Sequence, residues 1–451
     1  MSPKIALFLC VLFILFLLKL DFKSKPNVSI ALWIPLIWLL IISSRMVYLW
    51  FYQHSEADLE SNFVDPTIFS ALMVAGLFIL LRRKISWSDT LRRNAWVFIY
   101  FAYFGISIAW SDFPDIAFKR YIKAIGSLIM VLIILTEPAP AEAIKTIIRR
   151  CSYVLIPLSV ILYKYYPHLG RLYHRWTGEL MITGVTTNKN SLGVLCMVSS
   201  IIFISYLLTI WRNKKPFNNI NKKEAFPQFL VFLMALWMLI ISNSATAFVC
   251  FIVGSTILVG MKLSFIERNL KSFMYYIVFI ICGFLTLQLT FDVTQAIIGT
   301  LGRDTTLTGR TEIWKSAIGM ITNPLIGTGF ESFWLGERAQ IIGANYWFNL
   351  NEAHSGYVEV YLDGGLIGLF LLIVIIVNTF KNINNELLSQ LEYGKLIIVL
   401  FIVALAHNIT ESSFRPLQLM GFIFFLSVVK RPQLISVSTQ GVEANSMEKC
   451  S

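Results

Sequence analysis

A histidine and two acids stand at the start of one long apolar run. In EAHSGYVEVYLDGGLIG, residues 352–368, His354 precedes the run, and Glu359 and Asp363 lie inside it. The two acids are spaced i,i+4, so on a helix they share one face. Intramembrane acids mark a functional site by default, because a charge is costly in lipid. An imidazole of pKa about 6.5 can accept a proton from a hydroxyl group, so we predict acid–base chemistry at His354.

The residues around His354 predict how it is held. We expect His354 in the first turn of a helix, with Tyr357 and Tyr361 along the same face. The glycines of 364–368 predict the close approach of another helix. A structural alternative remains for Asp363, which could pair with a basic residue and hold the bundle together. A structural role at the interface is also the default for any single histidine, and His354 departs from it by its position.

Basic residues gather in three segments that we place outside the cytoplasm. Arginine grips phosphate oxygens with two parallel hydrogen bonds and stays charged, so converging cations predict a diphosphate site. Lipid phosphates could instead attract the lysines, above all Lys119, Lys123 and Lys315. The three groups are Lys119/Arg120/Lys123 in SDFPDIAFKRYIK, Arg171/Arg175/Lys189 in RLYHRWTGELMITGVTTNKNSLG, and Arg303/Arg310/Lys315 in LGRDTTLTGRTEIWKS.

The elements that position these residues are membrane helices. The 451 residues are 56% hydrophobic and 14% charged, with a mean hydropathy of +0.68, and apolar runs near the 20 or so residues that cross a bilayer recur throughout. We predict an all-α polytopic integral membrane protein with about 12–13 transmembrane helices. No signal-peptide cleavage site follows residues 5–20. The predicted spans are 5–20, 29–50, 67–81, 94–110, 120–136, 149–165, 191–211, 227–242, 245–261, 273–291, 357–379, 395–411 and 415–429.

The charge distribution predicts the orientation. Basic clusters at 82–93, 149–150, 212–223, 262–271 and 430–431 all fall on one side, which the positive-inside rule makes cytoplasmic. The net charge of +12 then reads as an orientation signal with anionic membrane lipids as its partner, and nucleic acid is excluded. The predicted parts are an N-terminal transmembrane bundle (1–291), an extracytoplasmic catalytic loop (292–356), C-terminal transmembrane helices (357–430) and a cytoplasmic tail (431–451).

The loop 292–356 is far longer than an ordinary connection, which favours function. We expect an amphipathic helix at about 310–322, closed by Asn323-Pro324. No metal-ligand spacing, nucleotide-binding loop or Gly-x-Ser-x-Gly elbow is present, and the six cysteines suggest no disulfide framework or metal site. The sequence therefore predicts a reaction without cofactor, nucleotide or metal.

Several motifs resemble the O-antigen ligase and polysaccharide polymerase superfamily, with the exopolysaccharide-polymerase branch nearest. The resemblance covers about residues 94–430 and is strongest in the outer loop and the helix after it. The motifs are TLTGRTEIW (306–314), NPLIGTGFESFW (323–334) and NEAHSGYVEVYLDGGLIGL (351–369), supported by WSDFPDIAFKRYIK (110–123), TGVTTNKNSLG (183–193) and HNITESSFRP (407–416).

The resemblance implies glycosyl transfer from a polyprenyl (undecaprenyl) diphosphate-linked oligosaccharide to a sugar hydroxyl. By analogy Arg310 matches the family's essential loop arginine and His354 its motif histidine, so both are predicted catalytic residues. The predicted diphosphate-binding residues are Arg120, Lys189 and Arg303, and the predicted acceptor-binding or supporting residues are Glu359, Tyr357, Trp314 and Asn190.

Three functions stay open at this point. The first is a polymerase that joins lipid-linked repeat units into exopolysaccharide or surface polysaccharide, with the growing glycan as acceptor. The second is a ligase that transfers finished glycan to lipid A-core. The third is a transporter of the lipid-linked glycan, which the absence of internal repetition disfavours. The polymerase and ligase readings place the protein in a bacterial inner membrane with a periplasmic site, beside a flippase and a chain-length regulator as candidate partners.

Overall fold

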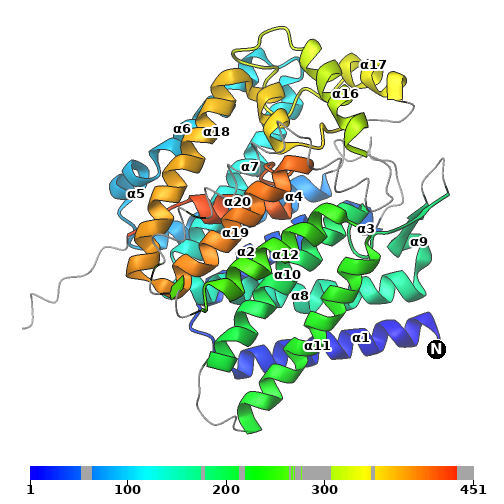
Figure 1. Ribbon diagram of the computed structural model, residues 1–451, viewed down its shortest axis with the longest axis vertical. Helices are drawn as coiled ribbons and strands as arrows, with labels where there is room; N and C mark the ends of the chain where they lie inside the picture. Colours follow the sequence, from blue (N-terminus) through cyan, green and yellow to red (C-terminus); the bar gives the residue numbers. More distant parts are fainter. Residues whose placement is uncertain are drawn as a thin grey trace, which may run out of the picture.

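The computed structural model describes residues 1–51, 63–173, 178–212, 219–263, 266, 267, 269, 276, 306–346 and 351–433. In these parts the chain is a bundle of helices with one short hairpin (Figure 1). The elements are α1 (Pro3–Lys23), η1 (Ile30–Leu32), α2 (Trp33–Ile42), α3 (Tyr48–Phe51), α4 (Val64–Arg82), α5 (Trp87–Arg93), α6 (Ala95–Ser107), η3 (Ile108–Trp110), α7 (Pro114–Leu135), α8 (Pro140–Tyr165), α9 (Pro167–Gly170), β1 (Arg171–Tyr173), β2 (Leu180–Ile182), α10 (Lys189–Arg212), α11 (Asn219–Ile241), α12 (Ala245–Gly260), α16 (Thr306–Gly319), α17 (Glu337–Tyr346), α18 (Gly356–Ser389), α19 (Leu391–Thr410) and α20 (Leu419–Val428).

The prediction of an all-α polytopic membrane protein is confirmed. Six of the described helices, α1, α4, α8, α10, α18 and α19, are long and apolar enough to cross a membrane, and further apolar helices are shorter. The predicted span 273–291 lies almost entirely outside the described residues. Strands β1 and β2 pair antiparallel and form the one sheet of the described chain.

Two predicted spans contain segments that are not helical. The run 29–50 is interrupted: α2 ends at Ile42, and Arg45 turns away to donate a hydrogen bond to the Thr186 carbonyl (3.1 Å). The run 415–429 becomes helical only at Leu419. A proline disfavours helical geometry in the residue before it, so Arg415 is not helical, and a turn at residues 416–417 precedes α20.

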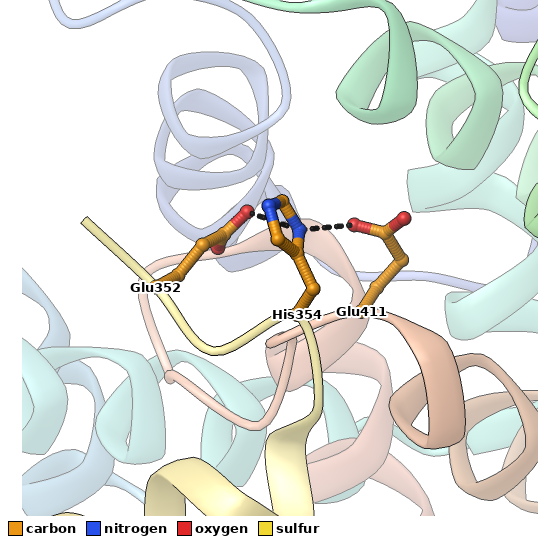
Figure 2. Close-up of side chains that lie close together, drawn as sticks. All are labelled: Glu352, His354 and Glu411. Carbon is orange, nitrogen blue, oxygen red and sulfur yellow. Dashed lines mark ion pairs between the residues drawn. The ribbon is translucent and has the colours of Figure 1, made fainter. Parts of the chain in front are cut away.

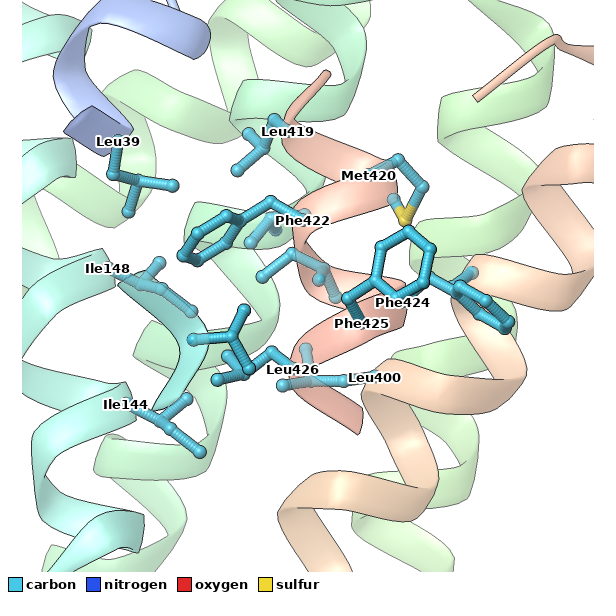
Figure 3. Packing of buried hydrophobic residues seen from close by; sticks show 14 of the residues in the cluster. Leu39, Ile144, Ile148, Leu400, Leu419, Met420, Phe422, Phe424, Phe425 and Leu426 are labelled. Carbon is cyan, nitrogen blue, oxygen red and sulfur yellow. The ribbon is translucent and has the colours of Figure 1, made fainter. Parts of the chain in front are cut away.

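The core lies around α20, which packs against α19, α7, α10 and α18. Leu39 of α2 and Ile144 and Ile148 of α8 belong to the same cluster of buried residues (Figure 3). Every residue of α20, LMGFIFFLSV, is buried, which matches its lack of a polar face. By contrast, only 22% of the residues in the apolar 18-residue stretch of α1 are buried, against 78% in the corresponding stretch of α19. The exposed apolar surface of α1 therefore faces the lipid, and α19 and α20 form the centre.

Two ends of the bundle differ in charge. At one end Arg83 pairs with Glu137, Lys262 Nζ lies 3.1 Å from Glu392 Oε1, and the Lys430 amide donates to Asn94 Oδ1. These contacts bring several of the predicted basic clusters together, and we call this the basic end. The opposite end carries α16 and α17 above the start of α18, and we call it the loop end (Figure 1).

Candidate active site

Helix α18 is interrupted soon after it starts at the loop end. At Gly365 the backbone leaves helical geometry, with φ +61° and ψ −160°. The backbone amide and carbonyl groups beside such a break lack partners within the helix, so other groups must bond to them. Here the Leu366 amide donates to the Pro324 carbonyl (2.9 Å), and the Ile367 amide donates to the Leu325 carbonyl (3.1 Å).

The segment after Pro324 and Leu325 also binds the carbonyl groups of α18 that lie just before the break. The Thr328 amide donates to the Leu362 carbonyl (3.0 Å), and the Gly329 amide donates to the Asp363 carbonyl (2.9 Å). The Asp363 side chain is buried and accepts a long bond from the Phe333 amide (3.4 Å). The segment NPLIGTGF is thus docked by backbone bonds into the gap in α18, and Asp363 helps to hold it.

Glycine is required at this junction because two backbones meet. A Cβ on Gly365 would lie 2.3 Å from the Leu325 carbonyl carbon, and a Cβ on Gly327 would lie 2.6 Å from the Asp363 carbonyl carbon. Both residues also have positive φ, a conformation in which side chains are strained. The motifs 323–334 and 351–369 are therefore two halves of one joint.

The predicted close approach of a helix is confirmed at the neighbouring glycine. A Cβ on Gly364 would meet the Phe104 ring of α6 at 2.7 Å, and one on Gly368 would meet it at 3.3 Å. Gly365 serves the loop joint instead.

Glu359 is the hub that ties the loop to the helices. Its carboxylate accepts hydrogen bonds from Trp334 Nε1 (2.9 Å), Arg415 Nη2 (3.1 Å), Ser412 Oγ (3.3 Å) and the Ala353 amide. The residue is 4% exposed, and charge-assisted bonds from several directions offset the cost of burying its charge. With these donors around it, Glu359 positions the segment that carries His354.

His354 lies in the turn before α18, so the prediction that it occupies the first helical turn is wrong. Its φ is +52°, a left-handed conformation that is uncommon for a residue with a side chain. The turn aims the ring at two acids (Figure 2): Nδ1 lies 3.1 Å from Glu352 Oε1 and 3.7 Å from Glu411 Oε2. The helical face expected to join it to Tyr357 and Tyr361 therefore does not exist.

The two carboxylates change the charge state of the ring. Burial lowers the pKa of His354, but the hydrogen bonds and charges of Glu352 and Glu411 outweigh burial and raise it to about 9. Burial likewise raises the pKa of Glu352, while the His354 contact lowers it by more. At neutral pH His354 is therefore an imidazolium between carboxylates, and the expected ordinary pKa is wrong.

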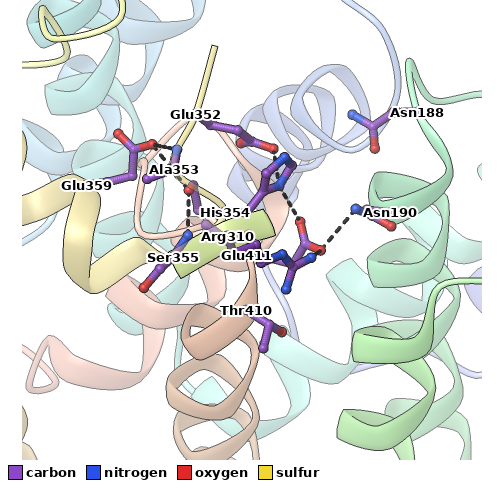
Figure 4. A network of polar contacts seen from close by, with 12 residues as sticks. Asn188, Asn190, Arg310, Glu352, Ala353, His354, Ser355, Glu359, Thr410 and Glu411 are labelled. Atoms are coloured by element: carbon purple, nitrogen blue, oxygen red, sulfur yellow. Dashed lines mark hydrogen bonds and ion pairs between the residues drawn. The ribbon is translucent and has the colours of Figure 1, made fainter. Parts of the chain in front are cut away.

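Glu411 joins segments that are distant in the sequence (Figure 4). Its Oε1 accepts a hydrogen bond from Asn190 Nδ2 (3.0 Å) at the start of α10 and lies 3.6 Å from Arg310 Nη2 in α16, while Oε2 faces His354. Arg310 and His354 are 22% and 29% exposed, whereas Glu411 is 7% exposed. The carboxylate thus forms the floor of a polar cluster that remains partly open.

Helix α16 carries Arg310 and is anchored one turn later. Trp314 Nε1 donates a hydrogen bond to the Ala353 carbonyl (2.7 Å), the residue before His354. Since the Ala353 amide is held by Glu359, the peptide units on both sides of Ala353 are fixed. The predicted amphipathic helix near 310–322 runs from Thr306 to Gly319.

The other predicted site residues fall in several places. Lys189 begins α10, beside Asn190, and pairs with no carboxylate among the described residues. Arg120 Nη1 donates to the Glu331 carbonyl (2.5 Å), so this arginine supports the loop. Tyr357 turns toward α19, where its hydroxyl donates to the Leu405 carbonyl (3.1 Å). Arg303 lies outside the described residues.

Three charged residues of the cluster were not singled out from the sequence. Glu411 and Arg415 stand in the motif HNITESSFRP, and Glu352 stands two residues before His354. An acid at the loop end of an apolar helix was the available signal for Glu411. Its meaning depends on α10 and α16, which are far from it in the sequence.

Glu352, His354 and Glu411 also offer the donor atoms that a metal ion would need. One ligand atom from each lies within 4.8 Å of the others, among the residues searched. A divalent ion would have to replace the proton between His354 and its carboxylates. It would also face the Arg310 guanidinium, which pairs with the same Glu411. The trio fits a proton between its members better than a dication.

Comparison with known proteins gives two matches. The model of the family described as O-antigen ligase matches residues 229–373, which include Arg310 and His354. Both matches support the resemblance to the O-antigen ligase and polysaccharide polymerase superfamily. It is also 24% identical over 308 residues to the exopolysaccharide production protein ExoQ of Rhizobium meliloti (strain 1021). That match covers 65% of this chain and 66% of the relative, slightly less than two thirds of its length.

Proposed function

We propose that the protein is a membrane glycosyltransferase that polymerises polyprenyl-diphosphate-linked repeat units into exopolysaccharide or surface polysaccharide. One observation carries the proposal: Glu411 holds the loop arginine, Arg310, and the motif histidine, His354, in one partly open cluster. The similarity to an exopolysaccharide production protein favours the polymerase over the ligase.

The leaving group is a diphosphate, and the cluster supplies positive charge for it. Arg310 and the His354 imidazolium stabilise the negative charge that develops as the sugar–phosphate bond breaks. Lys189 at the start of α10 is the third cation, beside the Glu411 partner Asn190. The diphosphate competes with Glu411 for Arg310, and the 3.6 Å spacing of that pair is loose enough to exchange.

The acceptor loses a proton in the same step. Its hydroxyl oxygen attacks the anomeric carbon, and the electrons of the sugar–phosphate bond leave with the diphosphate. Glu411, released from Arg310, takes the hydroxyl proton. Attack opposite the leaving group inverts the anomeric configuration. NMR of the donor and the product linkage tests this, and an unchanged configuration contradicts direct displacement.

We further propose that the cluster faces the periplasm of a bacterial inner membrane. The basic end, which the positive-inside rule assigns to the cytoplasm, lies opposite the loop end. Single cysteines at positions 310 and 354 are expected to react with an impermeant thiol reagent added to intact spheroplasts, and a cysteine at 92 is not. Labelling of positions 310 and 354 from opposite faces of the membrane would contradict the proposal that they form one site.

Deletion of the gene separates the candidate functions by the glycan that remains. Loss of a polymerase leaves single repeat units on their carrier or core. A stranded full-length polymer on the carrier lipid indicates the ligase that transfers glycan to lipid A-core. Disappearance of all outer-leaflet intermediates indicates a transporter.

The proposed step uses no metal. Polymerisation by the purified protein with lipid-linked donor is expected to persist in excess EDTA. Loss of activity in EDTA and its recovery on adding back one divalent cation would instead assign Glu352, His354 and Glu411 to a metal site.

A further inference from the structure

A cavity at the basic end has no part in the proposed reaction. It measures about 280 Å³ and lies between the ends of α18 and α20, the start of α19 and the last residue of α5. After the break at Gly365, α18 rises about 1.5 Å per residue, so Asn382 in this cavity is roughly 25 Å from Gly365 near the loop end. The cavity is therefore separate from the Glu411 cluster.

The cavity is lined by three cations and one carboxylate. Arg93, Lys430 and Arg431 contribute the positive charges and Glu386 the negative one. Arg93 keeps a loose pair with Asp89 (3.7 Å), and Lys430 and Arg431 pair with no carboxylate in the described part of the chain. Burial and the nearby Arg93 charge lower the pKa of Lys430, so the two cations repel each other. A bound anion would relieve that repulsion.

Polar groups point to a bound oxyanion. A cation after a helix C-terminus also stabilises the helix dipole, so Lys430 by itself is no sign of a ligand. The amide Nδ2 of Asn382, however, is enclosed and has no hydrogen-bond partner in the described structure. It lines the cavity together with Ser427 and Thr379, whose hydroxyl groups already donate to the backbone carbonyls of Phe424 and Ile375. An enclosed donor without a partner is costly, so an acceptor is expected there.

The walls of the cavity are built to hold their shape. Asn94 Oδ1 accepts a bond from the Lys430 amide (2.7 Å), and Asn94 Nδ2 donates to the Lys430 carbonyl (3.2 Å). The Ser86 amide donates to the Gln433 carbonyl (3.0 Å). These bonds fix the segment after α20 against the start of α5 and the junction of α5 and α6, so the cations are preorganised.

We propose that this cavity is a binding site for a phosphate group, held by Arg93, Lys430, Arg431 and the Asn382 amide. Pockets for drug-sized ligands measure about 300–1,000 Å³, so a headgroup-sized ligand fits this one. The phosphate belongs to an anionic phospholipid headgroup at the membrane surface or to a soluble phosphate. The site binds either at the basic end and leaves glycan transfer to the loop end.

The test uses the full-length protein in nanodiscs. Its melting temperature and its retained lipid, counted by native mass spectrometry, are measured in phosphatidylcholine with and without phosphatidylglycerol. A parallel arm adds inorganic phosphate to phosphatidylcholine nanodiscs against chloride of equal ionic strength. The test variants are the double variant Lys430→Gln/Arg431→Gln and Asn382→Leu, which removes an unpaired donor without removing a charge. Arg92→Gln is the matched control, because Arg92 lies on α5 beside Arg93 with its side chain 83% exposed.

For a lipid site, phosphatidylglycerol raises the melting temperature of the wild type and of Arg92→Gln. Both test variants bind it more weakly, and the double variant does so by roughly fivefold for each cation removed. A response to inorganic phosphate with the same variant pattern identifies a soluble phosphate as the ligand. Equal responses in all variants, or none in the wild type, overturn the proposal. If the double variant does not fold, Asn382→Leu decides.

Discussion

Two ionic clusters show how differently one membrane protein can use buried charge. Near the basic end, Asp21 of α1 accepts bonds from Arg149 Nε (2.8 Å) and Arg150 Nε (2.6 Å) of α8. The three side chains are 0%, 9% and 4% exposed. At the loop end, Glu411 meets Arg310 and His354 at 3.6 and 3.7 Å, and both partners are more than a fifth exposed.

Under the proposed function, the difference separates a structural cluster from a reactive one. The Asp21 cluster is closed and lies on regular helices, so it pins α1 to the bundle. The Glu411 cluster is open, its contacts are longer, and His354 is held with a positive φ. Loose pairs and a strained residue leave interactions that a substrate can complete. A buried charge in this protein therefore suggests function where its ion pairs are long and its partners are partly exposed.

Asp21→Ala should have the largest effect on stability. This change leaves two buried arginines without their shared acid, and we expect a loss of about 3–5 kcal/mol of stability. Thermal unfolding in detergent and protein abundance measure the loss, while activity per folded molecule stays near wild type. Asp89→Ala is the control, because its partly exposed pairs with Arg92 and Arg93 each contribute less than about 1 kcal/mol. Equal effects of the two changes would contradict the structural role of Asp21.

Arg310→Ala and His354→Ala should reduce activity and leave stability nearly unchanged. We expect polymer formation to fall by about 10²–10³-fold, or about 2.7–4 kcal/mol, because charge on the departing diphosphate loses a partner. The melting temperature should change little. Arg338→Ala is the matched control, since this loop-end arginine pairs with the exposed Asp112 outside the cluster. Wild-type activity in either test variant removes that residue from the mechanism.

Gly365→Ala should affect both regions through the loop joint. The positive φ alone costs about 1–3 kcal/mol for a side chain, and the added Cβ would clash with the Leu325 carbonyl. We expect reduced stability together with reduced activity. Gly319→Ala, where nothing lies within 4 Å of an added Cβ, is the control. Normal behaviour of Gly365→Ala would mean that the loop is not docked in the gap of α18.

The pH dependence sharpens the comparison further. The pKa of His354 is raised, so its ion pairs contribute to stability fully below about pH 6.5 and are lost as the pH rises through about 9. If the imidazolium is the active form, activity falls above about pH 9. Glu352→Gln removes one carboxylate and should move that fall toward neutral pH. Activity that rises up to pH 9 would assign His354 as the base instead.

Trp314→Phe should have the smallest effect. It removes the hydrogen bond to the Ala353 carbonyl, worth about 0.5–1.5 kcal/mol, and keeps an aromatic ring. We expect activity to fall several-fold with little change in melting temperature. A wild-type rate would indicate that the Glu359 contact alone positions Ala353.

Much of the fold followed from patterns along the chain. Apolar run length predicted helices α1, α4, α6, α10 and α12 closely, because one helix satisfies its own backbone in lipid. The broken run 29–50 was missed because the contact of Arg45 with Thr186 joins segments distant in the sequence. His354 was placed on a helix for the same reason: the Ser412 hydroxyl and the Glu359 carboxylate, which hold the turn, come from elsewhere in the chain.

The sequence by itself determined that this is a polytopic helical membrane protein, and its motifs predicted a resemblance to a glycan-handling superfamily with Arg310 and His354 as candidate catalytic residues. Run length, charge bias and motif order can be read along the chain without knowledge of any tertiary contact. The tertiary structure decided that Glu411 joins the two, that Glu359 is a positioning residue and that Gly365 opens α18 for a loop. Those roles depend on which carboxylate meets which cation, and helices far apart in the chain bring these groups together.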